Sequence, residues 1–134
     1  MSSDAQTTAF GPKTVLIVED NALNLRFFSD LLGLHGYATL TTSLGRAAVQ
    51  LALRHKPHLI VLDIQLPDIS GMDVARQLKA DEETRAIPII AVTAFAMSND
   101  RVKILASGCE DYLAKPFRGS ELIRLVELYT GVSG

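Results

Sequence analysis

The chain of 134 residues has one cysteine, no long apolar run and no block of charge of one sign. The single cysteine, Cys109, excludes an internal disulfide and favours a reducing compartment, where a free Cys is more often a small buried hydrophobe than a nucleophile. No stretch reaches the roughly 18 apolar residues of a membrane span, and the first residues lack the basic and then apolar pattern of a signal peptide. We therefore expect a cytoplasmic protein without membrane contacts.

The charge pattern gives no sign of a nucleic-acid partner. Thirteen Lys and Arg residues are interspersed with fifteen Asp and Glu residues, for a formal net charge of -2. Neither a basic face nor an acidic tail is present. The length fits one domain with a core of its own. Residues 1–12, rich in Ser, Thr and Ala, are expected to form a flexible tail before a single domain at 13–134.

Short apolar runs alternate with segments of helical periodicity. The run Leu59–Asp63 has no polar alternation and is closed by Pro67, Ser70 and Gly71, as in a strand that is buried on both faces. The expected strands are 14–18, 37–41, 59–63, 88–92 with Thr93 at its end, and 112–114. The expected helices are 23–34 with Asn21 as N-cap and Gly36 after its end, 44–55, 72–81, 102–108, and a last helix capped by Ser120 and ended by Gly131.

Five strands alternating with five helices predict an α/β fold: a doubly wound parallel sheet with helices on both faces. In such a sheet the carboxyl ends of all strands lie at one edge, where open α/β sheets bind their ligands. The residues expected at that edge are Glu19, Asp20, Asp63, Thr93 and Lys115. Each alone has an ordinary explanation as a cap or a solvated side chain. Their joint presence at one edge predicts a functional site.

Three carboxylates at one edge repel one another by up to ~4 kcal/mol per close pair at an effective dielectric of 20. Lys115 supplies one compensating charge, and a divalent cation would supply two. Mg²⁺ suits the site because it binds one or two carboxylates together with water, carbonyl oxygen and phosphate, and no Cys or His is near to favour zinc. A carboxylate can attack phosphorus, so Asp63 is the candidate nucleophile, with Thr93 and Lys115 placed to hold phosphoryl oxygens.

Four motifs in order resemble the response-regulator receiver domain with the CheY-like fold, from about Lys13 to Thr130. They are Val-Glu19-Asp20-Asn, Leu-Asp63-Ile-Gln-Leu-Pro67-Asp-Ile-Ser-Gly71, Ala-Val-Thr93-Ala and Tyr112-Leu-Ala-Lys115-Pro-Phe. The resemblance implies a flavodoxin-like three-layer sandwich with strand order 2-1-3-4-5.

The resemblance also implies a role for each site residue. Asp63 would accept a phosphoryl group from a phosphohistidine, and Glu19 and Asp20 would form the acidic pocket. Asp20, Asp63 and the backbone carbonyl of Gln65 would ligate Mg²⁺, with Glu19 acting through water. Thr93 and Lys115 would bind the phosphoryl group, and Tyr112 matches the aromatic switch of the family. Phe95 occupies a site-rim position where many relatives carry a polar residue.

Glu-Asp-Asn-Ala-Leu-Asn-Leu and Thr-Ala-Phe-Ala-Met are most similar to stand-alone regulators of the DivK type, which act in bacterial cell-cycle control. Because the chain ends after its last expected helix, we expect its output to be contact with another protein. The implied partners are a sensor histidine kinase or histidine phosphotransfer protein and a downstream protein target. We expect a monomer, with dimerisation on activation as an alternative, and no turnover of an external substrate.

Three other functions remain open at this point. A phosphohydrolase of the haloacid-dehalogenase kind also uses Mg²⁺ and a strand-end Asp, but it needs a second Asp where this chain has Gln65. A flavodoxin-like flavin module needs a hydroxyl- and glycine-rich phosphate loop where this chain has Glu19-Asp20-Asn21. A receiver-like module could also bind partners without being phosphorylated. The intact acid pair, Asp63 and Lys115 argue against that third function.

Overall fold

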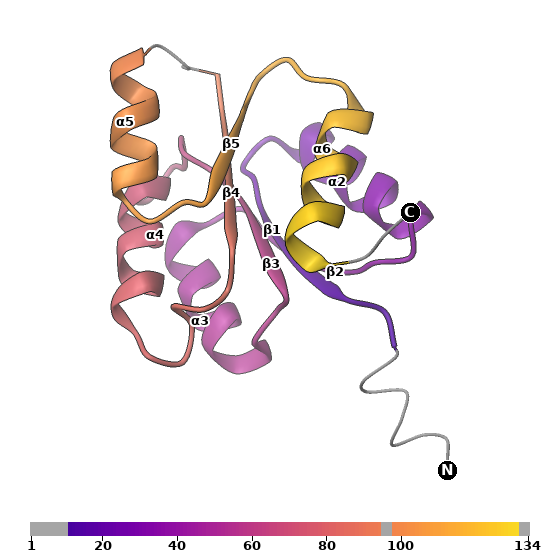
Figure 1. Cartoon of the computed structure of the whole chain (residues 1–134), viewed down its shortest axis with the longest axis horizontal. Helices are drawn as coiled ribbons and strands as arrows, with labels where there is room; N and C mark the ends of the chain where they lie inside the picture. Colours follow the sequence, from indigo (N-terminus) through magenta and orange to yellow (C-terminus); the bar gives the residue numbers. More distant parts are fainter. Residues whose placement is uncertain (1–10, 95–97, 132–134) are drawn as a thin grey trace.

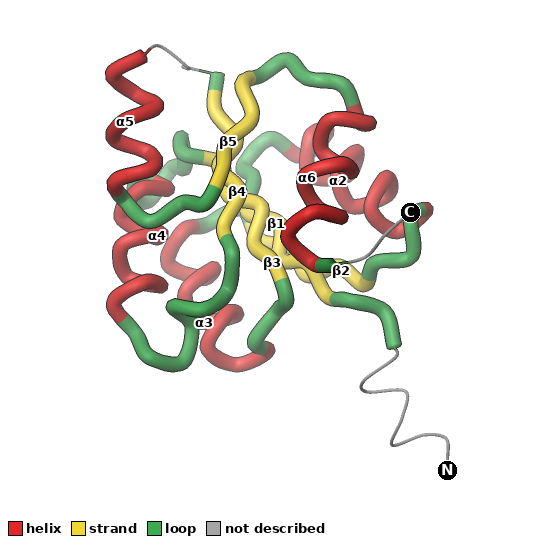
Figure 2. Tube along the Cα trace, in the orientation of Figure 1, coloured by secondary structure: helices red, strands yellow, loops and turns green. Residues whose placement is uncertain are grey.

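The computed structural model describes residues 11–94 and 98–131 and shows a strict alternation of strands and helices (Figures 1 and 2). Most of the predicted tail, residues 1–10, and Phe95 lie outside the described residues. The elements are β1 (Thr14–Val18), α2 (Ala22–Leu34), β2 (Ala38–Thr42), α3 (Gly45–His55), β3 (Leu59–Asp63), α4 (Gly71–Ala80), β4 (Ile89–Thr93), α5 (Ser98–Ala106), β5 (Asp111–Ala114) and α6 (Gly119–Thr130).

The five strands form one parallel sheet in the order β2-β1-β3-β4-β5, which confirms the predicted fold class and strand order. Helices α3, α4 and α5 cover one face, and α2 and α6 cover the other (Figure 1). Because successive side chains of a strand point to opposite faces, each of the three inner strands, β1, β3 and β4, contributes to both cores. Leu16 and Ile60 lie in the core under α3 and α4, whereas Val15 and Val61 lie in the core under α2 and α6.

The burial of each strand follows its place in the sheet. All five residues of β3 and of β4 are buried, so these inner strands have continuous apolar runs. Strand β2 lies at an edge and is half exposed, which explains its weaker apolar pattern. Cys109 is buried, as predicted. Among the described residues, no helix combines the length and apolar character needed to cross a membrane.

Several helix starts differ from the sequence prediction, and the largest difference is at α5, which begins at Ser98 and not at residue 102. Leu44 is the N-cap of α3 and not its first residue. Ser120 does not cap the last helix, because α6 begins at Gly119 and has Arg118 as its N-cap. The backbone N–H of Arg118 donates to the Glu121 carboxylate at 2.9 Å, so an acid in the first turn satisfies the N–H of the N-cap residue. Asn21 caps α2 as predicted.

The apolar stripe of α2 is wider than the surface that the helix buries. Only Phe28 and Leu32 of this helix are fully buried. Leu23 and Leu34, which share the helical spacing, are 80% and 85% exposed, and Phe27 is 48% exposed. Spacing alone therefore overestimated the core contribution of this helix, and its first turns carry apolar surface beside the carboxyl edge of the sheet.

Candidate functional site

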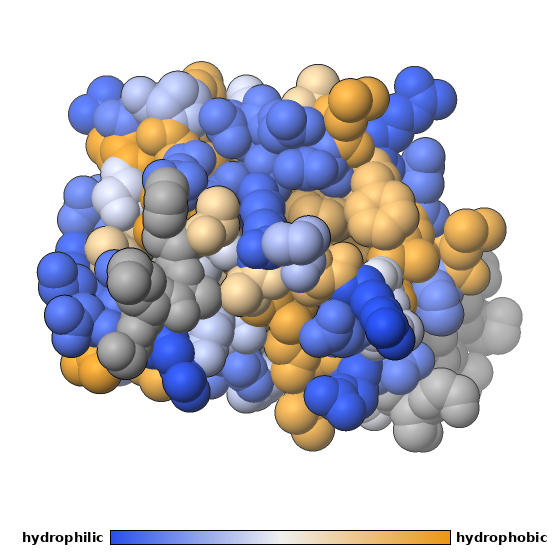
Figure 3. All heavy atoms as spheres, turned by 90° about the horizontal axis from the view of Figure 1, so that it is seen from above, coloured by the Kyte–Doolittle hydropathy of each residue, from blue (hydrophilic) through white to orange (hydrophobic). Residues whose placement is uncertain are grey.

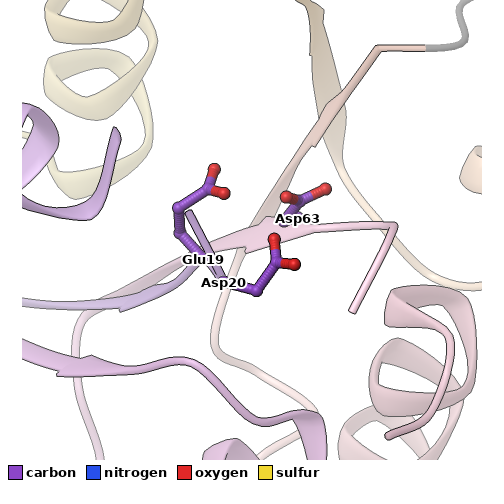
Figure 4. Close-up of side chains that lie close together, drawn as sticks. All are labelled: Glu19, Asp20 and Asp63. Atoms are coloured by element: carbon purple, nitrogen blue, oxygen red, sulfur yellow. The ribbon is translucent and has the colours of Figure 1, made fainter. Parts of the chain in front are cut away.

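The structure brings together the three predicted acids at the carboxyl edge of the sheet (Figure 4). Glu19 and Asp20 follow β1, and Asp63 is the last residue of β3, the strand paired with β1. One carboxylate oxygen from each of the three lies within 4.8 Å of the others. Glu19 and Asp63 are buried, whereas Asp20 is exposed. The cluster is therefore anchored in the core and open to solvent on one side.

Lys115 supplies a positive charge to this cluster from the end of β5. Its Nζ donates to Glu19 Oε1 at 2.9 Å and to Asp63 Oδ2 at 3.2 Å. The backbone N–H of Lys115 donates to the carbonyl of Thr93 at 2.7 Å, which fixes the lysine against the end of β4. The peptide bond between Lys115 and Pro116 is cis.

Burial and ion pairing shift two pKa values at the site. Burial raises the pKa of Glu19, and the hydrogen bonds from Lys115 and from the Asn21 N–H do not offset it. For Lys115, burial opposes the charged form, but the hydrogen bond to Glu19 and the negative charge of Asp63 outweigh it, so its pKa lies above the usual value. One lysine among three acids leaves an excess of negative charge.

The loop after β3 fixes the orientation of the Asp63 carboxylate. The Gln65 N–H donates to Asp63 Oδ1 at 2.9 Å, while Oδ2 accepts from Lys115. The loop closes where the Gly71 N–H donates to the carbonyl of Ile64 at 2.8 Å. A Cβ on residue 71 would lie 2.3 Å from the backbone oxygen of Asp63, so this approach requires glycine.

The donor atoms fit a hard divalent cation. All three clustered side chains offer carboxylate oxygen, and the exposed Asp20 leaves access from solvent. Mg²⁺ binds such oxygen sets and keeps several waters. The excess negative charge gives the cluster an electrostatic reason to take up a cation.

Thr93 and Tyr112 lie on the neighbouring strands. Thr93 is buried at the end of β4 and, with Gln65 and Asp100, lines a small cavity of about 230 Å³. Tyr112 is half-buried on β5, and the Arg101 guanidinium lies 5.2 Å from its ring centroid. The predicted site residues within the described ranges therefore lie at the carboxyl edge of the sheet or in the loops just after it, except Tyr112, which is the second residue of β5 and pairs with Ala91 of β4.

Sequence reasoning missed an apolar cavity on the other side of Lys115. It has a volume of about 430 Å³ and is lined by Asn24, Phe27, Phe28, Ala94, Lys115, Pro116 and Phe117. The rings of Phe28 and Phe117 stack with centroids 5.6 Å apart. Figure 3, which looks onto this edge of the molecule, shows apolar surface on the side of α2 and α6. The Lys-Pro-Phe motif was the available signal, but no role was assigned to its Phe.

Comparisons with known proteins agree with this geometry. Residues 15–127 match the family model described as "Response regulator receiver domain". The chain is 49% identical over 120 residues to the polar-differentiation response regulator DivK of Brucella anthropi, covering 90% of this chain and 98% of the relative. Its identity to the DivK of Brucella ovis is 50% over 119 residues, covering 89% and 97%.

Solved structures show the same fold. The receiver domain of the sensor histidine kinase PA1611 from Pseudomonas aeruginosa, which has a magnesium ion coordinated in its active site cleft, is 37% identical with a TM-score of 0.84. The match covers 90% of this chain and 99% of that domain. A putative response regulator from Chloroflexus aurantiacus is 28% identical with a TM-score of 0.85, over 90% and 98% of the two chains.

Proposed function

Because the chain belongs to the family of response regulator receiver domains, we propose that it is a phosphorelay receiver whose Asp63 accepts a phosphoryl group from a phosphohistidine. The observation that carries this proposal is the contact between Asp63 and Lys115 inside a cluster of three acids. Asp63 has one oxygen held by the Gln65 N–H and the other paired with the lysine, so its carboxylate is oriented before a donor arrives.

In the proposed transfer, a carboxylate oxygen of Asp63 attacks phosphorus in line with the bond to the donor imidazole. The new bond from oxygen to phosphorus forms an acyl phosphate, and the bond from phosphorus to nitrogen breaks with its electron pair returning to the imidazole. Lys115 then pairs with a phosphoryl oxygen, and the Thr93 hydroxyl donates to another. Each contact stabilises negative charge that the phosphoryl oxygens bring to Asp63.

Asp20, Asp63 and the Gln65 carbonyl would hold Mg²⁺ directly, and Glu19 would hold it through water. When bound, Mg²⁺ neutralises charge on the phosphoryl oxygens during transfer. The magnesium-bound neighbour supports this assignment, as does the oxygen-only donor set of the cluster. The side chains of this chain provide the rest: Glu19 positions Lys115 through a 2.9 Å bond, and burial keeps competing water from Asp63.

The signal would be a population shift in α5, β5 and α6. Contacts of Thr93 and Lys115 to the phosphoryl group favour one arrangement of these elements, and Tyr112 follows Thr93 as the switch residue. Moving such an equilibrium from mostly inactive to mostly active takes about 5 kcal/mol. A few charge-assisted hydrogen bonds at a partly buried site can supply that amount.

The biological setting that best fits the relatives is bacterial cell-cycle or division control, because the curated proteins at about 50% identity are named DivK. We propose a cytoplasmic protein whose partners are a histidine kinase or phosphotransfer protein and a downstream protein target. It would be a phosphoacceptor that assists its own phosphorylation, monomeric before activation, and would turn over no external substrate.

The test is phosphorylation by acetyl phosphate with Mg²⁺, followed by intact-mass spectrometry. The wild-type chain should gain one phosphoryl group, and Asp63→Asn should gain none. Asp30→Asn, which changes an exposed acid on α2, is the matched control and should behave like the wild type. An unmodified wild-type mass, or a modified Asp63→Asn variant, would show that the acceptor is wrongly assigned.

A further inference from the structure

Asp68 lies in the loop after β3, next to the site, and connects this loop to the start of α3. Its Oδ1 accepts the backbone N–H of Gly45 at 2.8 Å, and its Oδ2 accepts that of Arg46 at 2.9 Å. These are the first two N–H groups of α3, which have no partner inside the helix. The N-cap residue of α3, Leu44, has no polar side-chain atom to satisfy them. The cap of this helix therefore comes from the loop after β3.

The packing around this bridge is tight. Gly45 is buried, and a Cβ at this position would lie 2.8 Å from Ile69 Cγ1 and 2.8 Å from Val74 Cγ2. The start of α3 therefore lies directly against the loop and against α4, with no room for a side chain. Because Ile69 is next to Asp68 in the chain, the two hydrogen bonds and this apolar contact hold the same loop segment to the same helix end.

Electrostatics strengthen the bridge. The N-terminus of a helix carries a partial positive charge that favours a carboxylate. The hydrogen bond from the Arg46 N–H, with that from Gly45, lowers the pKa of Asp68 below its usual value despite partial burial. Asp68 is therefore ionised at neutral pH, and both of its oxygens act as acceptors.

The bridged segment is the one that contains Gln65. The loop is fixed at its two ends where the Gln65 N–H meets Asp63 and the Gly71 N–H meets Ile64. Between these ends, Asp68 fixes the middle of the loop to α3. The Gln65 carbonyl belongs to the peptide unit between residues 65 and 66, which lies between the anchor at the Gln65 N–H and the anchor at Asp68, so its direction depends on the backbone path between these two anchors.

We infer that Asp68 is a positioning residue of the metal site: by holding residues 65–68 against α3, it keeps the Gln65 carbonyl oriented towards the acid cluster. This inference rests on the proposed function, which takes that carbonyl as a Mg²⁺ ligand. Both carboxylate oxygens of Asp68 accept N–H groups of α3, so Asp68 would act on the metal site through the backbone of the loop. Residues that orient ligands typically change metal affinity or activity by about 10- to 100-fold when they are removed.

The test is a Mg²⁺ titration by isothermal titration calorimetry on the purified, metal-free chain. Asp68→Ala should raise the Mg²⁺ dissociation constant about tenfold, near the lower end of the range for orienting residues because the effect passes through the backbone. Asp68→Asn retains one acceptor oxygen and should raise it less. Asp73→Ala is the matched control, since Asp73 is an exposed acid of α4 that pairs with Arg76 at 2.8 Å, and it should leave the constant unchanged.

Two further measurements separate positioning from general loss of structure. Hydrogen exchange of residues 64–70 should accelerate in Asp68→Ala, with β3 and β4 unchanged. At saturating Mg²⁺, acetyl phosphate should still modify Asp63 in this variant. The inference is wrong if Asp68→Ala binds Mg²⁺ as the wild type does, or if Asp73→Ala weakens binding equally. In either case, phosphorylation of wild-type Asp63 would leave the proposed function intact. Absence of wild-type Mg²⁺ binding would overturn both.

Discussion

Replacing Asp63 with Asn in the metal-free protein should raise its free energy of unfolding, even though the change removes the proposed phosphoacceptor. The substitution keeps the shape of the side chain and an oxygen that accepts the Gln65 N–H. It removes one of three clustered negative charges and one partner of Lys115. The expected sign therefore depends on whether the two repulsions exceed the one attraction.

The distances favour the repulsions. Two charged carboxylates whose oxygens lie within 4.8 Å of each other repel by about 3.5 kcal/mol or more at an effective dielectric of 20. Asp63→Asn therefore removes about 7 kcal/mol of repulsion, from Glu19 and Asp20 together. The pair with Lys115 at 3.2 Å is worth about 5 kcal/mol on the same scale. The difference is about 2 kcal/mol in favour of the Asn variant. Relief from burying a charge has the same sign.

The assay is urea unfolding followed by far-ultraviolet circular dichroism, in EDTA at pH 8. This pH is chosen because burial raises the pKa of Glu19, and the repulsion between the carboxylates requires them to be ionised. Asp30→Asn, with a 71% exposed side chain, should change stability by less than about 0.5 kcal/mol. Excess Mg²⁺ should reduce the difference between wild type and Asp63→Asn. An Asn variant less stable than the wild type in EDTA would refute the charge-repulsion argument.

Three other predictions concern single positions. Gly71→Ala should destabilise the fold by about 1–3 kcal/mol, because the added Cβ clashes with the backbone of Asp63. Gly33→Ala, which has open space around it in α2, should stabilise the fold by up to about 1 kcal/mol. Thermal melts of the two variants test this. Burial raises the pKa of Cys109 to about 11, so a disulfide reagent at pH 8 should label the native chain far more slowly than the urea-unfolded chain, and rapid native labelling would contradict it. The pKa of Asp68 is lowered, so its stabilising contribution is present above the usual value of 3.8 and is lost as pH falls through the lower native value. The difference in free energy of unfolding between wild type and Asp68→Asn should therefore close when unfolding is measured at decreasing pH. A difference that stays constant would contradict this.

The sheet and the acidic cluster could be predicted from the sequence because local patterns determine them. Continuous apolar runs identify β3 and β4 as buried strands, and parallel topology places Asp63 and Thr93 at one edge. Glu19 and Lys115 are each the first residue after a strand, so topology places both at the carboxyl edge, but β3 and β4 lie between their strands and the 2.9 Å contact depends on how far the Lys115 side chain reaches. In these cases the short-range pattern and the global fold agree.

Features that depend on contacts between distant segments could not be predicted. The cap of α3 is Asp68, 23 residues after Gly45, and no local signal links the two positions. The helical spacing of α2 did not show that Leu23 would be exposed, because burial depends on which elements cover the helix. These two differences arise from tertiary packing overriding a local preference. The Ser120 prediction failed for a local reason: the helix begins one residue earlier, with Arg118 as its N-cap, and the Arg118 N–H bonds to Glu121 three residues on.

The bond between Lys115 and Glu19 joins residues that are 96 positions apart. During synthesis, the acids after β1 and β3 leave the ribosome well before the lysine that partly neutralises them. A nascent chain that has formed only its first four strands therefore has the acid cluster without its lysine, and the addition of β5 brings the missing positive charge. The charge balance of the pocket thus depends on the last strand, so an incomplete chain should not acquire a competent phosphoacceptor.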